Sequence, residues 1–320
     1  MIIVTGAAGF IGSAVIAHLN KQGERDITAV DVLRKNDQWK NLRGLDFNDY
    51  LDRSQLPEFL QNRKNVRAVV HMGACSSTTE QDAAYLMENN YRYTLNLARH
   101  CTEHNIRFIY ASSAATYGMG EHGYEDDESR LQLLKPMNMY GYSKQLFDLK
   151  ARREGWCRRI VGLKFFNVYG PNEYFKGDMA SVIFKAFNQI KESGQVKLFK
   201  SHHPDFTDGG QLRDFVYVKD AVNVIQYLLE YPQVHGIYNV GTGKARSFKD
   251  LVVAVFKAMN LEPNIKYIEM PESIRDRYQY FTEARMDKLM AAGYKRSFYS
   301  LEDGVGDYIQ NYLMKGFEHL

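Results

Sequence analysis

The sequence predicts an α/β protein with a doubly wound, open parallel sheet and a smaller α/β lobe at its C-terminal end. Two observations support this prediction. Residues 2–5 form a short apolar run that leads directly into a glycine-rich segment and a helical pattern. Further short apolar runs then alternate with helical patterns, which is typical of β-α-β units around a parallel sheet.

The glycine-rich segment spaces its glycines as Gly-x-x-Gly-x-x-Gly, at Gly6, Gly9 and Gly12. Between a strand and a helix, such glycines allow a tight turn, a close approach of the backbone to a pyrophosphate, and close packing of helix on strand. The helix N-terminus then faces the phosphates. The segment therefore predicts a Rossmann-type dinucleotide site, to which Phe10 and Ile11 would contribute.

The next predicted strand, 27–30, ends at Asp31. An acidic residue about twenty positions after the glycines usually binds the adenosine ribose. Basic residues follow it and could pair with a 2′-phosphate, so we favour NADP as the cofactor, although Asp31 argues partly for NAD. The residues expected at this end of the cofactor are Asp31, Val32, Arg34, Lys35 and Arg53.

Two further strands, at 66–71 and 106–111, place polar and small residues at the same edge of the sheet. A helix is predicted over 81–105, from which Asn89 could reach the loop after the first of these strands. Ser113 follows the second strand, where its hydroxyl could bond a substrate. The loop residues expected to contact the cofactor are Met72, Gly73, Ala74, Cys75 and Ser76.

Tyr140 and Lys144 are four residues apart and therefore lie on one face of a predicted helix. A neighbouring ammonium favours the phenolate of a tyrosine. Such a pair could take a proton from a sugar alcohol or return one to a ketone. This spacing is common by chance. The competing interpretation is that the two residues only lie on a solvated helix face.

The 320 residues, 45% of them hydrophobic, can bury a large core. We expect a dinucleotide-binding domain over 1–166, with returns near 213–240, and a substrate-binding lobe mainly over 167–320. A formal net charge of +3 is too small to predict nucleic-acid binding. The cysteines lack metal-ligand spacing, and no apolar run is long enough to cross a bilayer. We therefore expect a cytoplasmic protein without a metal site or membrane association.

Three motifs taken together resemble the extended short-chain dehydrogenase/reductase superfamily: the glycine segment, Ser-Ser-Ala-Ala-Thr-Tyr-Gly at 112–118, and Tyr140-x-x-x-Lys144. Longer segments resemble one family within it, the ADP-glyceromanno-heptose 6-epimerases, and this resemblance spans nearly the whole chain. These longer segments lie at 72–80, 111–118, 166–171, 176–182, 213–218 and 277–279.

The resemblance implies an isomerase that epimerises ADP-D-glycero-D-manno-heptose at C6 through reversible hydride transfer to tightly bound NADP. It implies that Tyr140 and Lys176 are the two acid/base residues, with Ser113 and Lys144 assisting the tyrosine. It also implies a homo-oligomer, commonly a pentamer, that supplies heptose for the lipopolysaccharide inner core. Lys144, Val168 and Lys176 would contact the cofactor. The substrate-binding residues would be Ser113, Asn167, Asp178, Lys185, Phe199, Lys200, Ser201, His202, Arg213 and Tyr278.

The chain departs from the family pattern at Asp178, Lys185 and Gln38, where the family often has serine, histidine and lysine, and in a longer loop at 202–212. Two alternatives remain open. One is a C4-type nucleotide-sugar epimerase on the same scaffold. The other is a dinucleotide-sensing protein without catalysis, although such a protein should lack Tyr140 or Lys144. A 4,6-dehydratase is disfavoured because no Asp-Glu pair stands near Ala115 and Thr116.

Overall fold

Seven parallel strands form the central sheet of the computed structural model, which describes residues 1–275 and 278–320. Their order across the sheet is β11-β6-β5-β4-β1-β2-β3. The predicted doubly wound α/β fold is therefore confirmed. The strands are β1 (Ile2–Thr5), β2 (Ile27–Asp31), β3 (Asp49–Asp52), β4 (Ala68–His71), β5 (Arg107–Ser113), β6 (Val161–Phe165) and β11 (Gly236–Val240).

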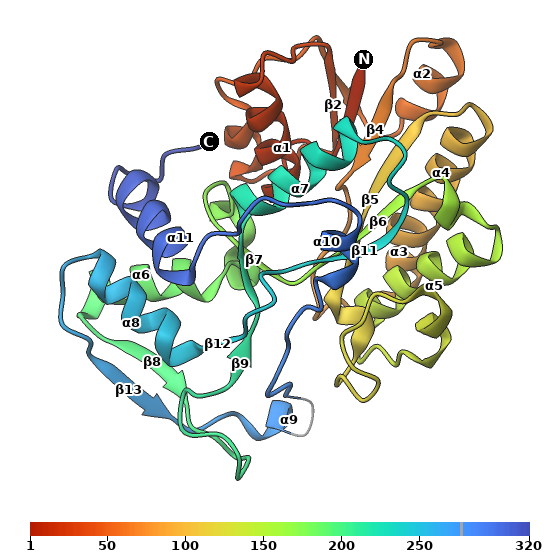
Figure 1. Cartoon of the computed structure of the whole chain (residues 1–320). Helices are drawn as coiled ribbons and strands as arrows, with labels where there is room; N and C mark the ends of the chain where they lie inside the picture. The colour runs from red at the N-terminus through yellow and green to blue at the C-terminus, as the bar shows by residue number, and fades with distance from the viewer. Residues whose placement is uncertain (276–277) are drawn as a thin grey trace.

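Helices cover both faces of this sheet (Figure 1). On one face α1 packs against α7, and on the other α2, α4 and α5 share a second apolar cluster. Because both faces are buried, the central strands are continuous apolar runs, such as Ile2–Thr5, rather than alternating ones. These helices are α1 (Phe10–Lys21), α2 (Leu56–Asn62), α4 (Tyr93–Glu103), α5 (Met139–Arg153) and α7 (Val218–Glu230).

The helix expected over 81–105 is present but is not uniform. It consists of α3 (Ala83–Leu86), a π-helical stretch over Met87–Arg92, and α4. The π stretch widens the turn and therefore changes which residues face the sheet. Elements such as β3, α2 and α7 were not predicted from the sequence.

A smaller lobe lies beyond the C-terminal edge of the sheet, at the lower left of Figure 1. It contains a parallel pair, β8 with β13, packed on α6 and α8, and α8 in turn contacts α11. Two short strand pairs, β7 with β10 and β9 with β12, complete the fold. The strands are β7 (Asn167–Tyr169), β8 (Val196–Phe199), β9 (Leu212–Arg213), β10 (Phe215–Tyr217), β12 (Arg246–Ser247) and β13 (Ile265–Ile268).

The C-terminal part of the sequence also shows helical patterns at 282–292 and 300–314. The first yields only α10 (Asp287–Ala291), and the second yields α11 (Leu301–Tyr308) followed by a π-helical turn, Ile309–Leu313. The other helices of this half are α6 (Val182–Ser193), α8 (Phe248–Ala258) and α9 (Glu272–Arg275). The short 3-10 segments are Asp37–Leu42, Ala114–Tyr117, Glu128–Leu133, Trp156–Arg158 and Tyr174–Met179.

The strand order reverses direction between β1 and β4, and this reversal fixes the place of the site. In an open parallel sheet the loops on either side of such a switch point diverge, leaving a crevice at the carboxyl ends of the strands. Here β1 ends at Thr5, β4 at His71 and β5 at Ser113. The motifs singled out from the sequence follow these three strands. The proposed boundary at 166/167 between two domains stays a prediction.

Candidate active site

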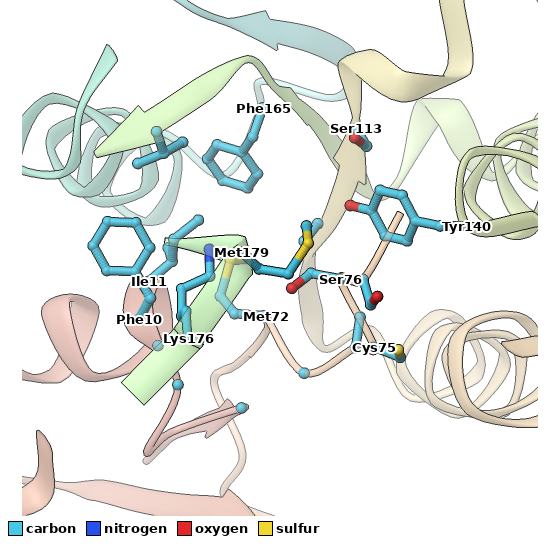
Figure 2. Close-up of a pocket in the computed structure, with 18 of the residues that line it drawn as sticks. Phe10, Ile11, Met72, Cys75, Ser76, Ser113, Tyr140, Phe165, Lys176 and Met179 are labelled. Atoms are coloured by element: carbon cyan, nitrogen blue, oxygen red, sulfur yellow. The ribbon is translucent and has the colours of Figure 1, made fainter. Parts of the chain in front are cut away.

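A cavity of about 670 Å³ lies at this switch point, between the sheet and the lobe. Figure 2 shows its middle, with Ser113 and Tyr140 on one side and Phe10, Ile11 and Lys176 on the other. Five parts of the chain contribute the residues around its middle. These are the glycine segment, the loop after β4, the end of β5, the start of α5, and the 3-10 segment Tyr174–Met179.

The glycine segment lines one end of the cavity with bare backbone. A Cβ on Gly12 would lie 2.0 Å from the carbonyl oxygen of Gly6, and one on Gly9 would lie 3.0 Å from it. The first distance is too short for any side chain, so α1 can pack this closely on β1 only with glycine at position 12. The N-terminus of α1 then opens into the cavity, as a pyrophosphate requires. These residues therefore fit a dinucleotide.

At the adenosine end of the cavity, Asp31 binds the backbone of the glycine segment and of the loop that follows β2. Its carboxylate accepts hydrogen bonds from the amides of Ala8 (2.8 Å) and Val32 (2.7 Å) and from the side chain of Gln38 (3.1 Å). Burial raises the pKa of this carboxyl, and these hydrogen bonds partly offset the rise. Arg34 lines the cavity and donates to the hydroxyl of Tyr85 at 2.9 Å.

The other two basic residues of this group differ in their placement. Arg53 also lines the cavity, where its guanidinium hydrogen-bonds the side chain of Asn89. Lys35 is exposed and stands apart from the lining residues. Two of the three basic residues expected near a 2′-phosphate are thus at the cavity.

The loop after β4, Met72 to Ser76, lies against the π-helical stretch of the long helix. Asn90 fixes this loop: its side chain accepts from the amide of Cys75 and donates to the carbonyl of Cys75, both at 2.9 Å. Asn89 was the residue expected to reach this loop. Asn89 lines the cavity, but its amide nitrogen donates to Asn90 at 2.9 Å. The π stretch places the two asparagines in positions that regular helical periodicity does not predict.

Tyr140 and Lys144 lie on the cavity side of α5, as their spacing predicts. The side chain of Asn138 caps the helix by accepting from the amide of Gly141 at 2.8 Å, which places Tyr140 in the first turn. The Lys144 ammonium donates to the carbonyl of Ala111, at the end of β5, at 2.8 Å. Figure 2 shows the hydroxyls of Tyr140 and Ser113 directed toward one another.

The pKa values of Tyr140 and Lys144 are not governed by the pair interaction that their spacing predicts. Burial raises the pKa of Tyr140, and the interaction that offsets the rise is with the Ser113 hydroxyl rather than with Lys144. Burial also lowers the pKa of Lys144 to about 8, against the opposing charges of Asp148 and Cys75. Desolvation of the two groups therefore outweighs the mutual effect that their spacing predicts.

Lys176 reaches the cavity from the segment that follows β7. Its ammonium lies 5.2 Å from the ring centre of Phe10, at the start of α1. Burial lowers the pKa of Lys176, and the nearby charge of Glu173 opposes this. Among residues 1–275 and 278–320, Lys176 makes no ion pair and its ammonium donates no hydrogen bond; the one charge that acts on it there is that of Glu173.

The residues expected to bind substrate divide into two groups. Ser113 and Asn167 line the cavity, as does Val168, which was expected to contact the cofactor. Arg213 lies deeper in the lobe, over the rings of Tyr278 (5.4 Å) and Phe248 (5.6 Å), and Phe248 also borders the cavity. Phe199 packs edge-on against Tyr278. The cluster formed by Phe199, Arg213, Phe248 and Tyr278 thus adjoins the cavity through Phe248.

The other residues of the expected substrate set make local contacts. Lys200 and His202 pair with Glu269 at 2.7 and 3.3 Å, and the hydroxyl of Ser201 donates to His203. Lys185 donates to the carbonyl of Asp178 at 2.6 Å. Arg277 of the segment 277–279 lies outside the described residues. The substrate roles of this set stay predictions.

Sequence reasoning missed the polar groups behind the cavity. Asp148 follows Lys144 by one helical turn and accepts from Lys164 of β6 (2.8 Å), Ser112 (2.7 Å) and Tyr110 (2.9 Å). The signal was a lysine in the middle of the otherwise apolar, fully buried run Val161–Phe165. A buried charge requires a partner, and that partner lies on α5.

Residues 1–275 and 278–320 contain no cluster of three or more His, Cys, Asp or Glu side chains suited to a metal ion. Over the same residues, no helix is long and apolar enough to span a membrane.

Comparisons with known proteins agree with this geometry. The sequence model of the NAD dependent epimerase/dehydratase family matches residues 2–241. A Nitratidesulfovibrio vulgaris protein named ADP-L-glycero-D-manno-heptose-6-epimerase is 57% identical over 316 residues, which cover 98% of both chains. The crystal structure of the Helicobacter pylori protein of that name superposes with a TM-score of 0.80 at 29% identity, covering 97% of this chain and 95% of that one.

A third relative carries a bound dinucleotide. The UDP-glucose 4-epimerase of Thermus thermophilus, solved in complex with NAD, superposes with a TM-score of 0.77 at 26% identity, covering 98% of this chain and 99% of that one. The family description and this complex both point to a nicotinamide dinucleotide as the cofactor, in keeping with the glycine segment. The chain therefore belongs to the NAD dependent epimerase/dehydratase family and, within it, to the ADP-L-glycero-D-manno-heptose-6-epimerases, which are isomerases.

Proposed function

We propose that this protein converts ADP-D-glycero-D-manno-heptose to ADP-L-glycero-D-manno-heptose by inverting C6, with tightly bound NADP as its redox cofactor. The names of the relatives support the substrate. One observation supports the mechanism above all others. Two proton-transfer groups, Tyr140 and Lys176, reach the same cavity from different elements, beside the glycine segment (Figure 2).

Inversion by this route requires a hydride to leave C6 and to return on the opposite face of the resulting ketone. A bound oxidised nicotinamide supplies the hydride acceptor and later the donor. As the hydride leaves, the C6 hydroxyl gives its proton to one side chain. As the hydride returns, the ketone oxygen takes a proton from the other side chain. Tyr140 and Lys176 are our assignments for these two roles.

The acidities of the two groups suit opposite roles in one turnover. A raised pKa keeps Tyr140 protonated, ready to donate to a ketone oxygen. A lowered pKa shifts Lys176 toward the neutral amine, which can accept a proton. Ser113 is assigned to orient the Tyr140 hydroxyl, and Lys144, fixed to Ala111, to bind the nicotinamide ribose and stabilise the phenolate when it forms.

The preference for NADP over NAD is part of the proposal. Arg34 and Arg53 line the adenosine end of the cavity and could pair with a 2′-phosphate. Gln38, which takes the place of the lysine common in the family, already donates to Asp31. The nucleotide that copurifies with the protein, released by heat and identified by mass spectrometry, tests this preference. NADP is expected, and NAD alone would show that Asp31 decides the selectivity.

The resemblance extends the proposal to the setting of the enzyme. We propose a homo-oligomer, a pentamer in the family, that works in the cytoplasm and supplies heptose to the lipopolysaccharide inner core. Light scattering coupled to size-exclusion chromatography measures the mass of the assembly against a chain mass of 37.0 kDa. A monomer at micromolar concentration would contradict the oligomer.

The activity itself is tested by incubating the purified protein with ADP-D-glycero-D-manno-heptose and separating the two C6 epimers. We expect the mixture to approach equilibrium without added cofactor. A parallel incubation with UDP-glucose and UDP-galactose tests the C4 alternative. Turnover of a UDP-hexose without turnover of the ADP-heptose would replace the proposal by that alternative. No turnover of either sugar by a protein that retains its nucleotide would favour a sensing role.

A further inference from the structure

The segment that carries Lys176 is closed by a single buried carboxylate. Glu173 has no exposed surface. One of its oxygens accepts from the hydroxyl of Ser181 at 2.6 Å, and the other accepts from the amide of Ser181, also at 2.6 Å. The first oxygen also accepts from the amide of Gly170 at 3.3 Å. The carboxylate thus joins the entry and the exit of the loop that presents Lys176.

The backbone within this loop directs Lys176 toward the cavity. The amide of Lys176 donates to the carbonyl of Glu173 at 3.0 Å, and the amide of Ala180 donates to the carbonyl of Gly177 at 3.0 Å. Between these two turns Gly177 adopts φ 54° and ψ −126°, a conformation that favours glycine. The chain reverses there, and the Lys176 side chain extends over Phe10.

The charge of Glu173 also acts on its surroundings. Burial raises the pKa of Glu173, while the bonds from Ser181 and the charge of Lys176 oppose the rise. In return, the carboxylate opposes the lowering of the Lys176 pKa by burial. The other titratable groups that face Glu173 are the phenols of Tyr174, in the same loop, and of Tyr308, on α11. Both phenols stay neutral at working pH because their pKa values are raised.

We infer that Glu173 is the positioning residue for Lys176: its carboxylate holds the loop between Gly170 and Ser181 closed, keeps the amine at the cavity, and places a negative charge near it. The inference deepens the proposed function, since it rests on Lys176 as one of the two proton-transfer groups. Glu173 itself is separated from the reacting atoms by the loop and acts through the lysine.

The inference is tested with Glu173→Gln, which keeps the size of the side chain and one acceptor oxygen but removes the charge. Trace acetylation of the purified protein with acetic anhydride over a range of pH, read by mass spectrometry, gives the pKa of Lys176 without any assay of activity. We expect that pKa to fall in the variant and that of Lys144 to stay unchanged. We also expect kcat for epimerisation to fall roughly 10- to 100-fold, as displacement of a reacting group by about 1 Å does, with bound nucleotide retained.

Asp220→Asn is the matched control, because Asp220 is another buried carboxylate that accepts a backbone amide, that of Tyr299 at 2.9 Å, but lies at the start of α7. It should leave the pKa of Lys176 unchanged. An unchanged Lys176 pKa and unchanged kcat in Glu173→Gln would overturn the inference. If Glu173→Gln shifts the pKa of Lys176 but the unchanged protein has no epimerase activity, the proposed function is overturned. The effect of the Glu173 charge on Lys176 would then still stand.

Ser181→Ala approaches the same loop from its other end and applies if Glu173→Gln does not fold. It removes one hydrogen bond to the carboxylate and keeps the charge. We expect a lower kcat with little change in the pKa of Lys176. Full kcat in this variant would count against loop closure as the way in which Glu173 acts.

Discussion

The Lys164 ammonium lies 2.8 Å from the Asp148 carboxylate, and neither side chain has any exposed surface. Lys164 also donates to the hydroxyl of Thr116 at 2.6 Å, and Ser112 donates to Asp148 at 2.7 Å. The pair therefore joins β6, the end of β5 and α5 behind Ser113, Tyr140 and Lys144. A buried pair of this kind is strongly destabilising when only one partner is removed, because the other charge is left without compensation.

Lys164→Met should accordingly lower the free energy of unfolding by about 3–5 kcal/mol, measured by urea titration of the circular dichroism signal. Combining it with Asp148→Leu should recover much of that loss, since no unpaired charge remains. If Lys164→Met instead lost less than about 1 kcal/mol, the size typical of surface pairs, the pair would not be buried as described.

Tyr140→Phe removes one hydroxyl and leaves the ring in place. If Tyr140 is one of the two proton-transfer groups, epimerisation should fall about 10²- to 10⁴-fold, the usual contribution of general acid–base catalysis. The bound nucleotide, measured by absorbance, should remain. Tyr142→Phe is the control, because Tyr142 is 44% exposed on the opposite side of α5. Equal activity of the two variants would show that the role of Tyr140 is misassigned.

As the pH rises, the titration of Lys144 should lower the activity of the enzyme but increase this group's contribution to stability. Its pKa is lowered from 10.5 to about 8, and the titratable groups around it are Asp148, Cys75 and His71. If the ammonium is the working form, activity should be lost as the pH rises through about 8. Between about 8 and 10.5 the unfolded chain holds the proton that the folded chain has released, so this group's contribution to stability increases with pH.

Lys144→Met tests both parts of that prediction. The variant should have little activity at any pH. The difference in unfolding free energy between it and the unchanged protein should vary between pH 8 and 10.5 and be flat below that window. Activity of the unchanged protein that persists well above pH 8 would mean that the neutral amine suffices.

Gly12→Ala should impair the cofactor site and the packing of α1. The added Cβ would lie 2.0 Å from the carbonyl of Gly6, so the glycine segment must move. We expect a loss of about 1–3 kcal/mol of stability, typical of overpacking, together with loss of the copurifying nucleotide. Gly306→Ala is the control. Gly306 lies on α11, and a Cβ added there would meet no atom within 4 Å. Retention of a full complement of nucleotide by Gly12→Ala would contradict the role of this segment.

Local spacing was enough to predict part of the fold and of the site. The glycine segment lies between a strand and a helix, and Tyr140 and Lys144 lie one helical turn apart, so their placement depends only on regular geometry. The same holds for the loop after β4. Each of these features lies within a few residues of one strand end or on one helix face, where periodicity predicts direction.

Features that depend on contacts between distant segments were missed. Asn90 rather than Asn89 fixes the loop at Cys75, because a π-helical stretch shifts the register of the long helix. Lys164 finds its partner 16 positions away on another element. Glu173 reaches Ser181 only because Gly177 reverses the chain between them. No single periodicity connects such pairs, and their meeting is a property of the tertiary packing.

Lys176→Met gives the most direct test of a two-group mechanism. The thioether can occupy the space of the lysine stem beside Phe10, and no ion pair among the described residues is lost, so stability should change by less than about 1 kcal/mol. Epimerisation should fall about 10²- to 10⁴-fold while the nucleotide stays bound. Lys191→Met is the control, since Lys191 is an exposed lysine that also lies over a phenylalanine ring, that of Phe187 at 5.6 Å, and is not among the cavity-lining residues. With Lys176 removed, Tyr140, as the phenolate that Lys144 is proposed to stabilise, can still accept a proton from the one epimer whose C6 hydroxyl faces it. That epimer alone should reduce bound nicotinamide in a single turnover, visible as new absorbance. Reduction by both epimers would mean that a group other than Lys176 completes the inversion.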